Sequence, residues 1–380
     1  MDKMSNDIQT LNLIDFYRFL KKDDLQEESN AKNVFRFLEA KARAKGIPLS
    51  GSFELTPLCN LDCKMCYIHL NNKQLNKQLL PSDEWKNLIT QAHKFGMIRA
   101  SLTGGECLTY PAFDDIYMHL YHLGIRPSIL SNGILLDEKR IDFFRKHPPR
   151  RIQITLYGST DETYESVTGH RVFELVYEHI LSAKNAGLPI AISITPNEYM
   201  YNDIRSLLKT AVELQLPYYI NSSLKPPRKN TGRTEHDLTD EQYIELYRIA
   251  NEISNSSLTE IDSSELPDVN HEAHKRHGLR CGGGRSAFVM TYDGQICPCH
   301  SLYETRVDAI KMGFSEAWKQ LNALANNYPI PGECISCKYR DVCLTCPAMH
   351  THAPAIGHCD PRICERTKKL VMAGIIPLPK

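Results

Sequence analysis

Three cysteines in the segment Thr56–Tyr67 have the spacing C-x3-C-x2-C, which suits an iron-sulfur cluster. Cys59, Cys63 and Cys66 follow a predicted strand and belong to one short loop. A four-iron cubane with three thiolate ligands keeps one iron without a protein ligand, and that iron is open to another molecule. A structural zinc site, which wants four protein ligands, and buried unreactive thiols are the alternatives. The spacing therefore predicts a cluster with one open iron.

This loop resembles the signature of the radical S-adenosylmethionine (SAM) enzymes. The resemblance implies that Cys59, Cys63 and Cys66 hold a [4Fe-4S] cluster whose open iron is chelated by the amine and carboxylate of SAM. One electron from such a cluster splits SAM into methionine and a 5'-deoxyadenosyl radical, so the cofactor carries the difficult chemistry. The position before the last cysteine, usually aromatic in the family, is Met65. Met65 and Tyr67, which is a candidate to supply the missing ring, are the expected cofactor contacts of the loop.

The composition bounds the class of protein. A chain of 380 residues with 42% hydrophobic content can form one large domain and a smaller one. Lys plus Arg equals Asp plus Glu at 45 each, so no net field favours nucleic acid or an anionic membrane. The amino terminus has no apolar signal core and no run of about eighteen apolar residues occurs, so we expect a cytoplasmic protein. Thirteen cysteines, an odd number, favour metal ligation over disulfides.

Residues 50–222 alternate six predicted strands with amphipathic helices, which indicates an α/β fold with a parallel sheet. The strands are expected at 51–55, 99–103, 126–130, 151–156, 189–195 and 217–221. The clearest helix spans 82–95, with Ser82 as its N-cap and Gly96 after its end, and Gly124 and Gly187 end two others. Six units cannot close an eight-stranded barrel, so we expect a partial (β/α)6 TIM-like barrel with its ligand at the carboxyl ends of the strands. The family resemblance implies the same barrel, and a doubly wound sheet is the alternative.

Four segments follow from this pattern. Residues 1–46 are predicted to be helical and to pack on the radical SAM barrel, which we place at 47–235. Residues 236–280 form a helical linker that contains the capping box Thr239-Asp-Glu-Gln242. Four cysteines precede residue 281 and nine follow from there, so we place a small cysteine-rich domain at 281–370.

Two more motifs follow strand ends, at the edge of the sheet where the cysteine loop is expected. Gly104, Gly105 and Glu106 match the Gly-Gly-Glu motif of the family, which implies that they hold the methionyl amine of SAM. Paired glycines also let backbone come close to a ligand. Ser131 and Asn132 resemble the family's Ser-Asn-Gly segment, which implies contacts with the ribose or carboxylate of SAM, although an ordinary Asn-Gly turn is the alternative.

Two weaker cofactor candidates come later in the barrel. Thr155 lies where many relatives have Ser-x-Asp-Gly, so the resemblance implies a ribose contact, and Tyr157 departs from that pattern. Thr168-Gly169 replaces a frequent Arg-Gly pair whose arginine would bind the cofactor carboxylate. Arg171 is the candidate substitute, and a plain surface arginine is the alternative.

The cysteine-rich tail has a second dense pattern, C-x2-C-x5-C-x2-C. Zinc ribbons also use two C-x2-C pairs, but they separate the pairs by more than the five residues found here. Residues 281–366 resemble the SPASM domain, an auxiliary two-cluster extension of radical enzymes that modify peptides and proteins. The resemblance implies one auxiliary [4Fe-4S] cluster on Cys281, Cys299 and Cys346, and another on Cys334, Cys337, Cys343 and Cys364.

Three residues near these ligands have open roles. Cys297 and Cys359 are additional, and either is a candidate to complete the first auxiliary cluster, whose fourth iron is otherwise open to substrate. Relatives that mature sulfatases place a basic aspartate directly after the second upstream cysteine, and this chain has His300 there. Histidine accepts a proton near neutral pH, so His300 is a candidate catalytic base, with a solvated or cluster-adjacent histidine as the alternative.

The resemblance implies a radical SAM enzyme that abstracts hydrogen from a peptidyl substrate during maturation of a ribosomally made peptide, giving a crosslink, thioether, epimer or oxidised side chain. Sulfatase-type protein oxidation, modification of a small molecule such as a tetrapyrrole, and a non-catalytic iron-sulfur carrier are the alternatives. The expected partners are the peptide or protein substrate and an electron donor of the flavodoxin or ferredoxin type. A separate leader-binding protein is a further expectation, because residues 1–46 look too short for a complete leader-binding domain.

Overall fold

The computed structural model describes residues 27–70, 79–221, 224–225, 227–228, 236–256, 278–279, 281–340, 342–343, 350 and 357–376. Expectations about residues 1–26 and about Cys346 lie outside this part of the chain.

Strands and helices alternate along the barrel segment, as the sequence predicts. The strands are β1 Ser50–Glu54, β2 Arg99–Thr103, β3 Ser128–Ser131, β4 Arg151–Leu156, β5 Ile190–Ile194, β6 Tyr218–Ile220, β7 Ala287–Met290, β8 Gln295–Cys297 and β9 Val307–Asp308. The α-helices are α3 Glu27–Lys45, α4 Ser82–Lys94, α5 Phe113–His122, α6 Glu138–Lys146, α7 Asp161–Thr168, α8 Phe173–Asn185, α9 Ile204–Glu213, α10 Asp240–Ser256, α11 Ala309–Met312, α12 Phe314–Asn326, α13 Gly332–Ile335 and α14 Pro361–Met372. Two short 3-10 helices lie at Cys107–Thr109 and Tyr201–Asp203.

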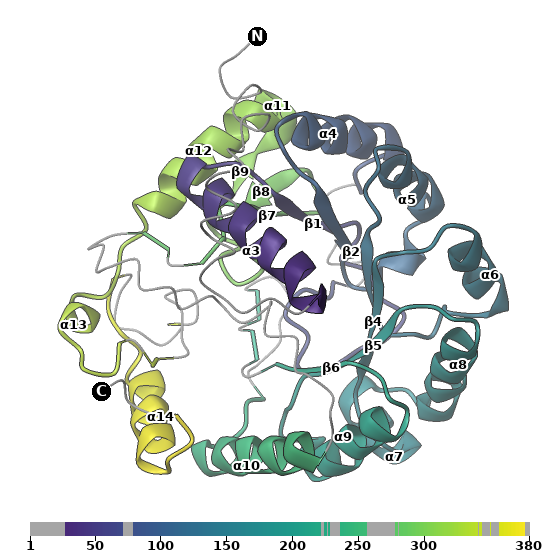
Figure 1. The fold of residues 1–380 in the computed structure, drawn as a ribbon, viewed down its shortest axis with the longest axis vertical. Helices are drawn as coiled ribbons and strands as arrows, with labels where there is room; N and C mark the ends of the chain where they lie inside the picture. The colour runs from purple at the N-terminus through teal and green to yellow at the C-terminus, as the bar shows by residue number, and fades with distance from the viewer. Residues whose placement is uncertain are drawn as a thin grey trace.

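The sheet has the strand order of a partial barrel. Strands β6-β5-β4-β3-β2-β1 are neighbours in sequence order, and every pair among them is parallel. A doubly wound sheet would reverse its order at a switch point, so the barrel prediction is confirmed. Helices α4, α5, α6 and α8 surround the outside of these strands in Figure 1.

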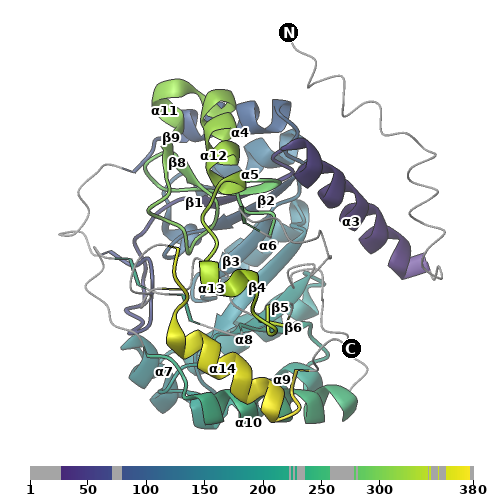
Figure 2. The ribbon, with the colours of Figure 1, turned by 90° about the vertical axis from the view of Figure 1, so that its left-hand side faces the viewer.

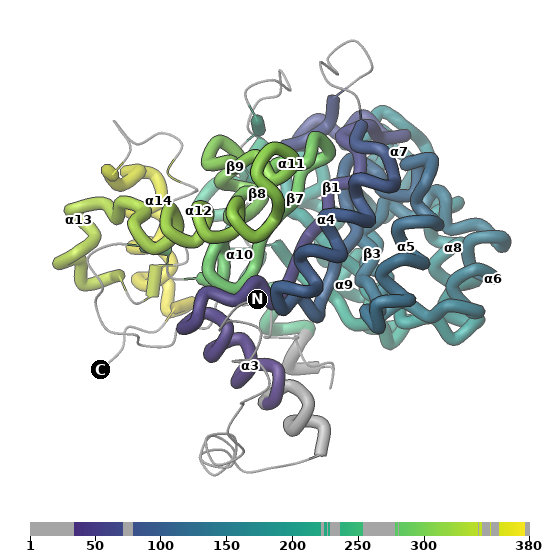
Figure 3. Tube along the Cα trace, turned by 90° about the horizontal axis from the view of Figure 1, so that it is seen from above, coloured from purple at the N-terminus to yellow at the C-terminus, as the bar shows by residue number. Residues whose placement is uncertain are grey.

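Three short strands that the sequence did not predict extend this sheet. Strand β7 pairs in parallel with β1, and β8 and β9 follow antiparallel, which gives nine strands in all. Helix α12 packs over the extension, with Phe314 and Trp318 fully buried near Phe288. The domain boundary at residue 281 stays a prediction, but one sheet continues across it. Figure 3 shows α13 and α14 at the opposite end of the molecule from α6 and α8.

Side chains alternate between the two faces of β4, and those on its inner face are polar. On β4, Ile152, Ile154 and Leu156 are buried in the main core beneath the helices. Side chains at alternate positions point to the opposite face, so Gln153 and Thr155 face the barrel interior.

The local helix signals are correct with one exception. Gly96, Gly124 and Gly187 follow the ends of α4, α5 and α8 with positive φ angles of 117°, 78° and 75°. The predicted N-cap at Ser82 is wrong, because Pro81 takes the extended cap conformation (φ −68°, ψ 158°) and no side chain caps the helix. Proline fixes φ near this value, so the helix begins with Ser82 as its first residue.

Helix α3 covers the amino-terminal end of the barrel, which agrees with the packing predicted for this part of residues 1–46. The guanidinium of Arg99, at the start of β2, lies 2.9 Å from the centre of the Phe35 ring. The indole N–H of Trp318 donates to the Gly46 carbonyl at 2.6 Å. The carboxyl ends of the strands remain uncovered by α3. Within the described residues, no helix combines the length and the apolar character needed to cross a bilayer.

Candidate cluster and cofactor site

The cysteine loop, residues 56–67, is held on one side by the Gly-Gly-Glu turn after β2. The Gly105 N–H donates to the Thr56 carbonyl at 2.7 Å, and the Glu106 N–H donates to the Leu58 carbonyl at 2.9 Å. A Cβ atom on Gly104 or Gly105 would lie 2.3 Å from one of these carbonyl oxygens. The structure therefore gives the paired glycines a definite role, which is the close approach of the turn to the cysteine loop.

The other side of the cysteine loop is held by the end of α7. The Asp62 N–H donates to the Thr168 carbonyl at 3.0 Å, and the Lys64 N–H donates to the Val167 carbonyl at 2.9 Å. Gly169 ends α7 in the left-handed conformation, with φ 76°. These carbonyls belong to the last turn of the helix, where they have no intrahelical partner, so the loop satisfies them.

The three thiols form one group that suits a metal cluster. Backbone N–H groups face two sulfurs, from Leu61 to Cys59 at 3.4 Å and from His69 to Cys66 at 3.3 Å. Burial raises the pKa of the Cys59 thiol to about 12 and that of Cys63 well above its usual value, and the other thiolates of the group raise both further. Three bare thiolates are therefore unfavourable here, whereas a cationic metal centre would compensate them. The donor set fits a cubane.

No group of three or more His, Cys, Asp or Glu side chains in the described residues is arranged to hold a single metal ion. In a cubane each thiolate binds a different iron, so its ligands stand further apart than those of one ion.

Glu106 is the centre of a buried hydrogen-bond network. Its side chain is fully buried and accepts hydrogen bonds from the Leu108 N–H at 3.0 Å and the Asn132 N–H at 2.8 Å. The Ser131 hydroxyl donates to the same carboxylate at 3.0 and 3.1 Å. Burial raises the pKa of Glu106, and these hydrogen bonds oppose that effect. The predicted residues Glu106, Ser131 and Asn132 are thus brought together, and their contact with the methionyl group stays a prediction.

Asn132 connects this network to the cysteine loop. Its side-chain amide lies 3.6 Å from the Cys59 sulfur and donates to the Asn60 side-chain oxygen at 2.7 Å. Tyr157, which the sequence marked only as a departure from the family pattern, lies close to the thiols, since burial and then the charge of Cys63 raise the pKa of its hydroxyl. Hydrogen bonds to cluster sulfurs tune the reduction potential, so Asn132 and Tyr157 are candidates for that role. Nothing in the sequence marks Tyr157 as a neighbour of the thiols.

Three other predicted cofactor contacts differ in their surroundings. Met65 is buried within the main hydrophobic core. Thr155 faces the barrel interior on β4, at the predicted end of the sheet. Arg171 lies on the surface with a side chain 48% exposed and paired with Glu162 and Glu165, which fits the surface-arginine interpretation.

A charge cluster, which we define as Ser52, Glu54, Arg228 and His300, lies at the carboxyl end of β1. The Arg228 guanidinium donates to both oxygens of the fully buried Glu54, at 2.6 and 3.0 Å. His300 Nδ1 donates to Glu54 at 2.7 Å, and its Nε2 faces the Ser52 hydroxyl at 3.3 Å. Burial alone would raise the pKa of Glu54, but the charge of Arg228 and the hydrogen bond from His300 outweigh it and lower the pKa to about 2.

The charge cluster links the cysteine loop to the cysteine-rich tail. The Arg228 N–H donates to the Tyr67 carbonyl at 3.1 Å, and the Tyr67 ring centre lies 6.0 Å from that of His300. Lys225 also lies over the Tyr67 ring, at 4.8 Å. Burial lowers the pKa of His300, and the charge of Lys225 lowers it further. His300 is thereby favoured in its neutral form, with Nε2 as the proton acceptor.

The tail cysteines that the structure describes lie in two groups, and their binding of auxiliary clusters stays a prediction. Cys281 and Cys299 pack against the same small apolar cluster. Burial raises the pKa of Cys299, and the nearby Cys281 thiolate raises it further. Cys297 is fully buried, and its thiol donates to the Cys299 carbonyl at 3.4 Å. The second group, which we call the distal thiols, consists of Cys334, Cys337, Cys343, Cys359 and Cys364.

Comparison with known proteins agrees with this geometry. Residues 53–211 match the model of the radical SAM superfamily, and these residues contain the cysteine loop, the Gly-Gly-Glu turn and Asn132. Residues 53–211 therefore form a radical SAM domain. Proteins of this superfamily bind SAM on a [4Fe-4S] cluster.

Two curated relatives and one solved protein show the range of similarity. An AdoMet-dependent heme synthase of Methanosarcina barkeri is 24% identical over 320 residues, covering 78% of this chain and 90% of that protein. A PqqA peptide cyclase of Streptomyces rochei is 22% identical, covering 81% and 84%. SuiB of Streptococcus suis bound to S-adenosylmethionine has a TM-score of 0.68 at 14% identity, covering 93% of this chain and 87% of that one. SuiB bound to its precursor peptide SuiA gives 0.68 at 16% identity, covering 90% and 82%. At these identities the solved structures establish a shared fold.

Proposed function

We propose that this protein is a radical SAM enzyme that removes hydrogen from a peptidyl substrate during maturation of a ribosomally made peptide. The observation that carries the proposal is the three-thiol loop, held at the carboxyl end of β1 within a matched radical SAM domain. A peptide substrate is supported by the PqqA peptide cyclase relative and by the complex of SuiB with its precursor peptide.

The residues around the loop have distinct tasks. Cys59, Cys63 and Cys66 hold the [4Fe-4S] cluster, which when bound with SAM supplies the electron that splits the sulfonium. Asn132 places an amide beside Cys59, and Glu106 fixes the backbone of Asn132. The polar inner face of the barrel receives the SAM and the substrate, and the Gly-Gly-Glu turn closes one side of it.

His300 is the candidate base for a substrate that must lose a proton. The Glu54 carboxylate accepts from Nδ1, so that nitrogen carries the proton, and the unprotonated Nε2 accepts from the Ser52 hydroxyl at 3.3 Å. This orientation resembles the way in which carboxylates fix a catalytic histidine in other enzymes. His300→Asn should keep SAM cleavage but lose modified peptide, whereas Ser52→Ala, as the control, should retain both. Unchanged product formation by His300→Asn would remove His300 from the mechanism.

The auxiliary clusters and the partners belong to the same proposal. The two tail groups of cysteines hold auxiliary [4Fe-4S] clusters that accept an electron from the substrate radical. The reducing electron comes from a flavodoxin or ferredoxin type of donor, and a leader-bearing peptide uses a separate leader-binding protein. Oxidation of a protein substrate, as in sulfatase maturation, uses the same residues.

A second candidate function has its own support. The heme synthase relative favours a tetrapyrrole or another small molecule as the substrate.

The substrate test uses anaerobically reconstituted protein with SAM and dithionite. One arm contains the peptide from a short open reading frame beside the gene, deuterated on its side chains, and the other contains a tetrapyrrole. We expect deuterium in 5'-deoxyadenosine and a peptide of lower mass. Deuterium transfer and a mass change in the tetrapyrrole arm alone would replace the peptide proposal. SAM cleavage with neither substrate altered would refute both choices.

A further inference from the structure

The distal thiols number one more than a cubane needs. Cys334, Cys337, Cys343 and Cys364 are the four that the SPASM resemblance implies, and Cys359 lies among them. The Cys359 sulfur is 2.8 Å from the Cys364 sulfur, and the charge of the nearby Cys334 contributes to the raised pKa of Cys359 after burial. The sequence left Cys359 as a candidate for the first auxiliary cluster, but the structure places it with the distal thiols.

Only one thiol of this close pair can bind the cluster at a time. Each iron of a cubane presents one open corner to a protein thiolate, and those corners point away from one another. Two sulfurs in contact, such as those of Cys359 and Cys364, therefore compete for the same corner. Cys334, Cys337 and Cys343 supply the other three.

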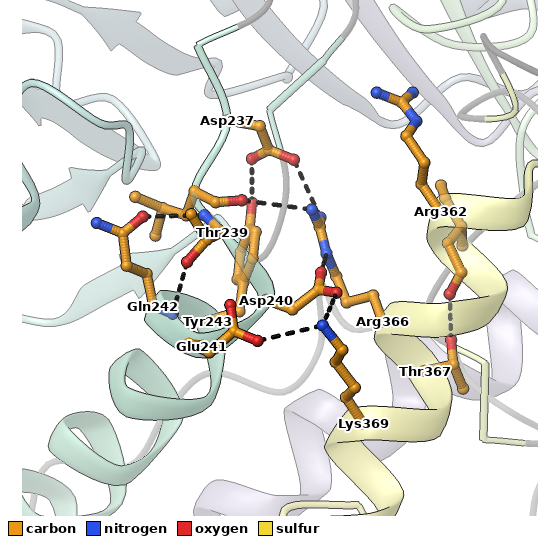
Figure 4. Close-up of polar contacts among 12 residues, drawn as sticks. Asp237, Thr239, Asp240, Glu241, Gln242, Tyr243, Arg362, Arg366, Thr367 and Lys369 are labelled. Carbon is orange, nitrogen blue, oxygen red and sulfur yellow. Dashed lines mark hydrogen bonds and ion pairs between the residues drawn. The ribbon is translucent and has the colours of Figure 1, made fainter.

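Cys364 is held firmly against the barrel. It lies on α14, which runs beside α10 in Figure 2. Two residues further along this helix, Arg366 donates to Asp237 and Asp240, both at 3.0 Å, and its guanidinium lies over the Tyr243 ring at 4.2 Å. Figure 4 shows these contacts together with Lys369, which bonds Asp240 at 3.0 Å and contributes a second attachment of α14.

Helix α10, which Arg366 and Lys369 contact, has a side-chain cap at its N-terminus. Thr239 and Gln242 make the predicted capping box, in which the Gln242 N–H donates to the Thr239 hydroxyl at 3.2 Å and the Gln242 side chain accepts from the Thr239 N–H at 2.9 Å. Figure 4 shows this box beside Asp240. The position of Cys364 is therefore fixed relative to the barrel.

Cys359 directly precedes α14 and has a separate attachment, to α13. It precedes Asp360, the fully buried N-cap of α14, whose side chain accepts from the Arg362 N–H at 3.0 Å. The neighbouring His358 bonds Glu333 at 2.8 Å, next to Cys334 on α13. The two thiols can thus reach the same iron, one from α14 and the other from the segment that His358 attaches to α13.

We propose that Cys359 and Cys364 are interchangeable fourth ligands of the distal auxiliary cluster, with Cys364 bound at rest and Cys359 in reserve. This inference rests on the auxiliary clusters of the proposed function. In the exchange, the Cys359 thiolate bonds to the iron as the Cys364–iron bond breaks, and the proton of the Cys359 thiol moves to the departing Cys364 sulfur. No electron is transferred. The distal cluster then has no iron open to substrate, which directs substrate chemistry to the other two cluster sites.

The test compares Cys359→Ser, Cys364→Ser and the double variant after anaerobic reconstitution of the full chain. Each single variant should keep the wild-type iron and sulfide content. The double variant, left with three thiolates and one open iron at the distal cluster, should lose about one iron more than the wild type when both are exposed briefly to air. Cys107→Ser is the control, because that buried thiol lies outside all three groups and should keep all iron. Loss of iron in either single variant, or a double variant that keeps as much iron as the wild type after exposure to air, would overturn the exchange.

Alkylation gives a readout that does not depend on the double variant folding. In the wild type, iodoacetamide should label Cys359 and spare Cys364, and in Cys364→Ser the label on Cys359 should disappear. Persistent labelling of Cys359 in that variant would overturn the proposal. Formation of 5'-deoxyadenosine from SAM should continue in all variants, so its loss would report on the proposed function instead.

Discussion

Replacing Arg228 with methionine should strongly destabilise the barrel. The change removes the cation that faces Glu54 while it keeps most of the apolar stem of the side chain. Arg228 and Glu54 are 5% and 0% exposed, so water cannot replace the lost partner. The carboxyl would be left buried without its main compensating charge, which is the costly way to break an ion pair.

The size of the effect follows from the ionisation of Glu54. Its pKa falls from 4.5 to about 2 in the folded protein, which corresponds to about 3 kcal/mol of favourable interaction with the ionised form. Breaking buried pairs elsewhere costs about 3–5 kcal/mol, in agreement with this figure. We therefore expect Arg228→Met to lower the free energy of unfolding by about 3 kcal/mol or more.

Urea unfolding of the metal-free protein measures the change, with fluorescence from the buried Trp85 and Trp318 as the signal. Arg171→Met is the matched control, because its ion pairs are exposed and should contribute less than about 1 kcal/mol. In a double-mutant cycle, Glu54→Gln with Arg228→Met should cost less than the two single changes added together. A loss below about 1 kcal/mol for Arg228→Met, or strict additivity in the cycle, would refute the reasoning.

Three other predictions follow from the site. Gly105→Ala should displace the cysteine loop, since the new Cβ would lie 2.3 Å from a carbonyl oxygen. An iron assay should then show no iron bound at that loop. Gly332→Ala is the control, because it has open space around it and should leave the iron content unchanged. Asn132→Ala should make the reduction potential of the cluster on Cys59 more negative in an EPR titration, because a donor to sulfur is lost, and an unchanged potential would contradict this. The depressed pKa of Glu54 stabilises the fold above pH 4.5, and this contribution declines as the pH falls toward 2. Glu54→Gln should therefore flatten the acid limb of a stability-against-pH curve, and an unaltered limb would contradict the assignment.

The sequence predicted the parts of the fold that depend on local signals. Buried runs marked the six barrel strands within about two residues of their ends, and glycines marked the ends of α4, α5 and α8. The cysteine spacing located the principal site because one loop contains all of its thiols. Strands β7, β8 and β9 were missed because they are short and, unlike the equally short β3 and β6, lie outside the regular alternation of strands and helices.

The parts that could not be predicted depend on contacts between distant residues. Glu54 and Arg228 are 174 positions apart, and a single glutamate near the end of a strand does not identify its partner. Glu106 was recognised by its motif, but its inward turn toward Ser131 and Asn132 required the positions of two strands.

The most direct test of the account is SAM cleavage by the three-thiol loop. Anaerobically reconstituted protein, reduced with dithionite and mixed with SAM, should yield 5'-deoxyadenosine and methionine, and the triple variant of Cys59, Cys63 and Cys66 to alanine should yield neither while its tail keeps iron. Purified protein that contains zinc in place of iron, or a triple variant that still cleaves SAM, would contradict the account.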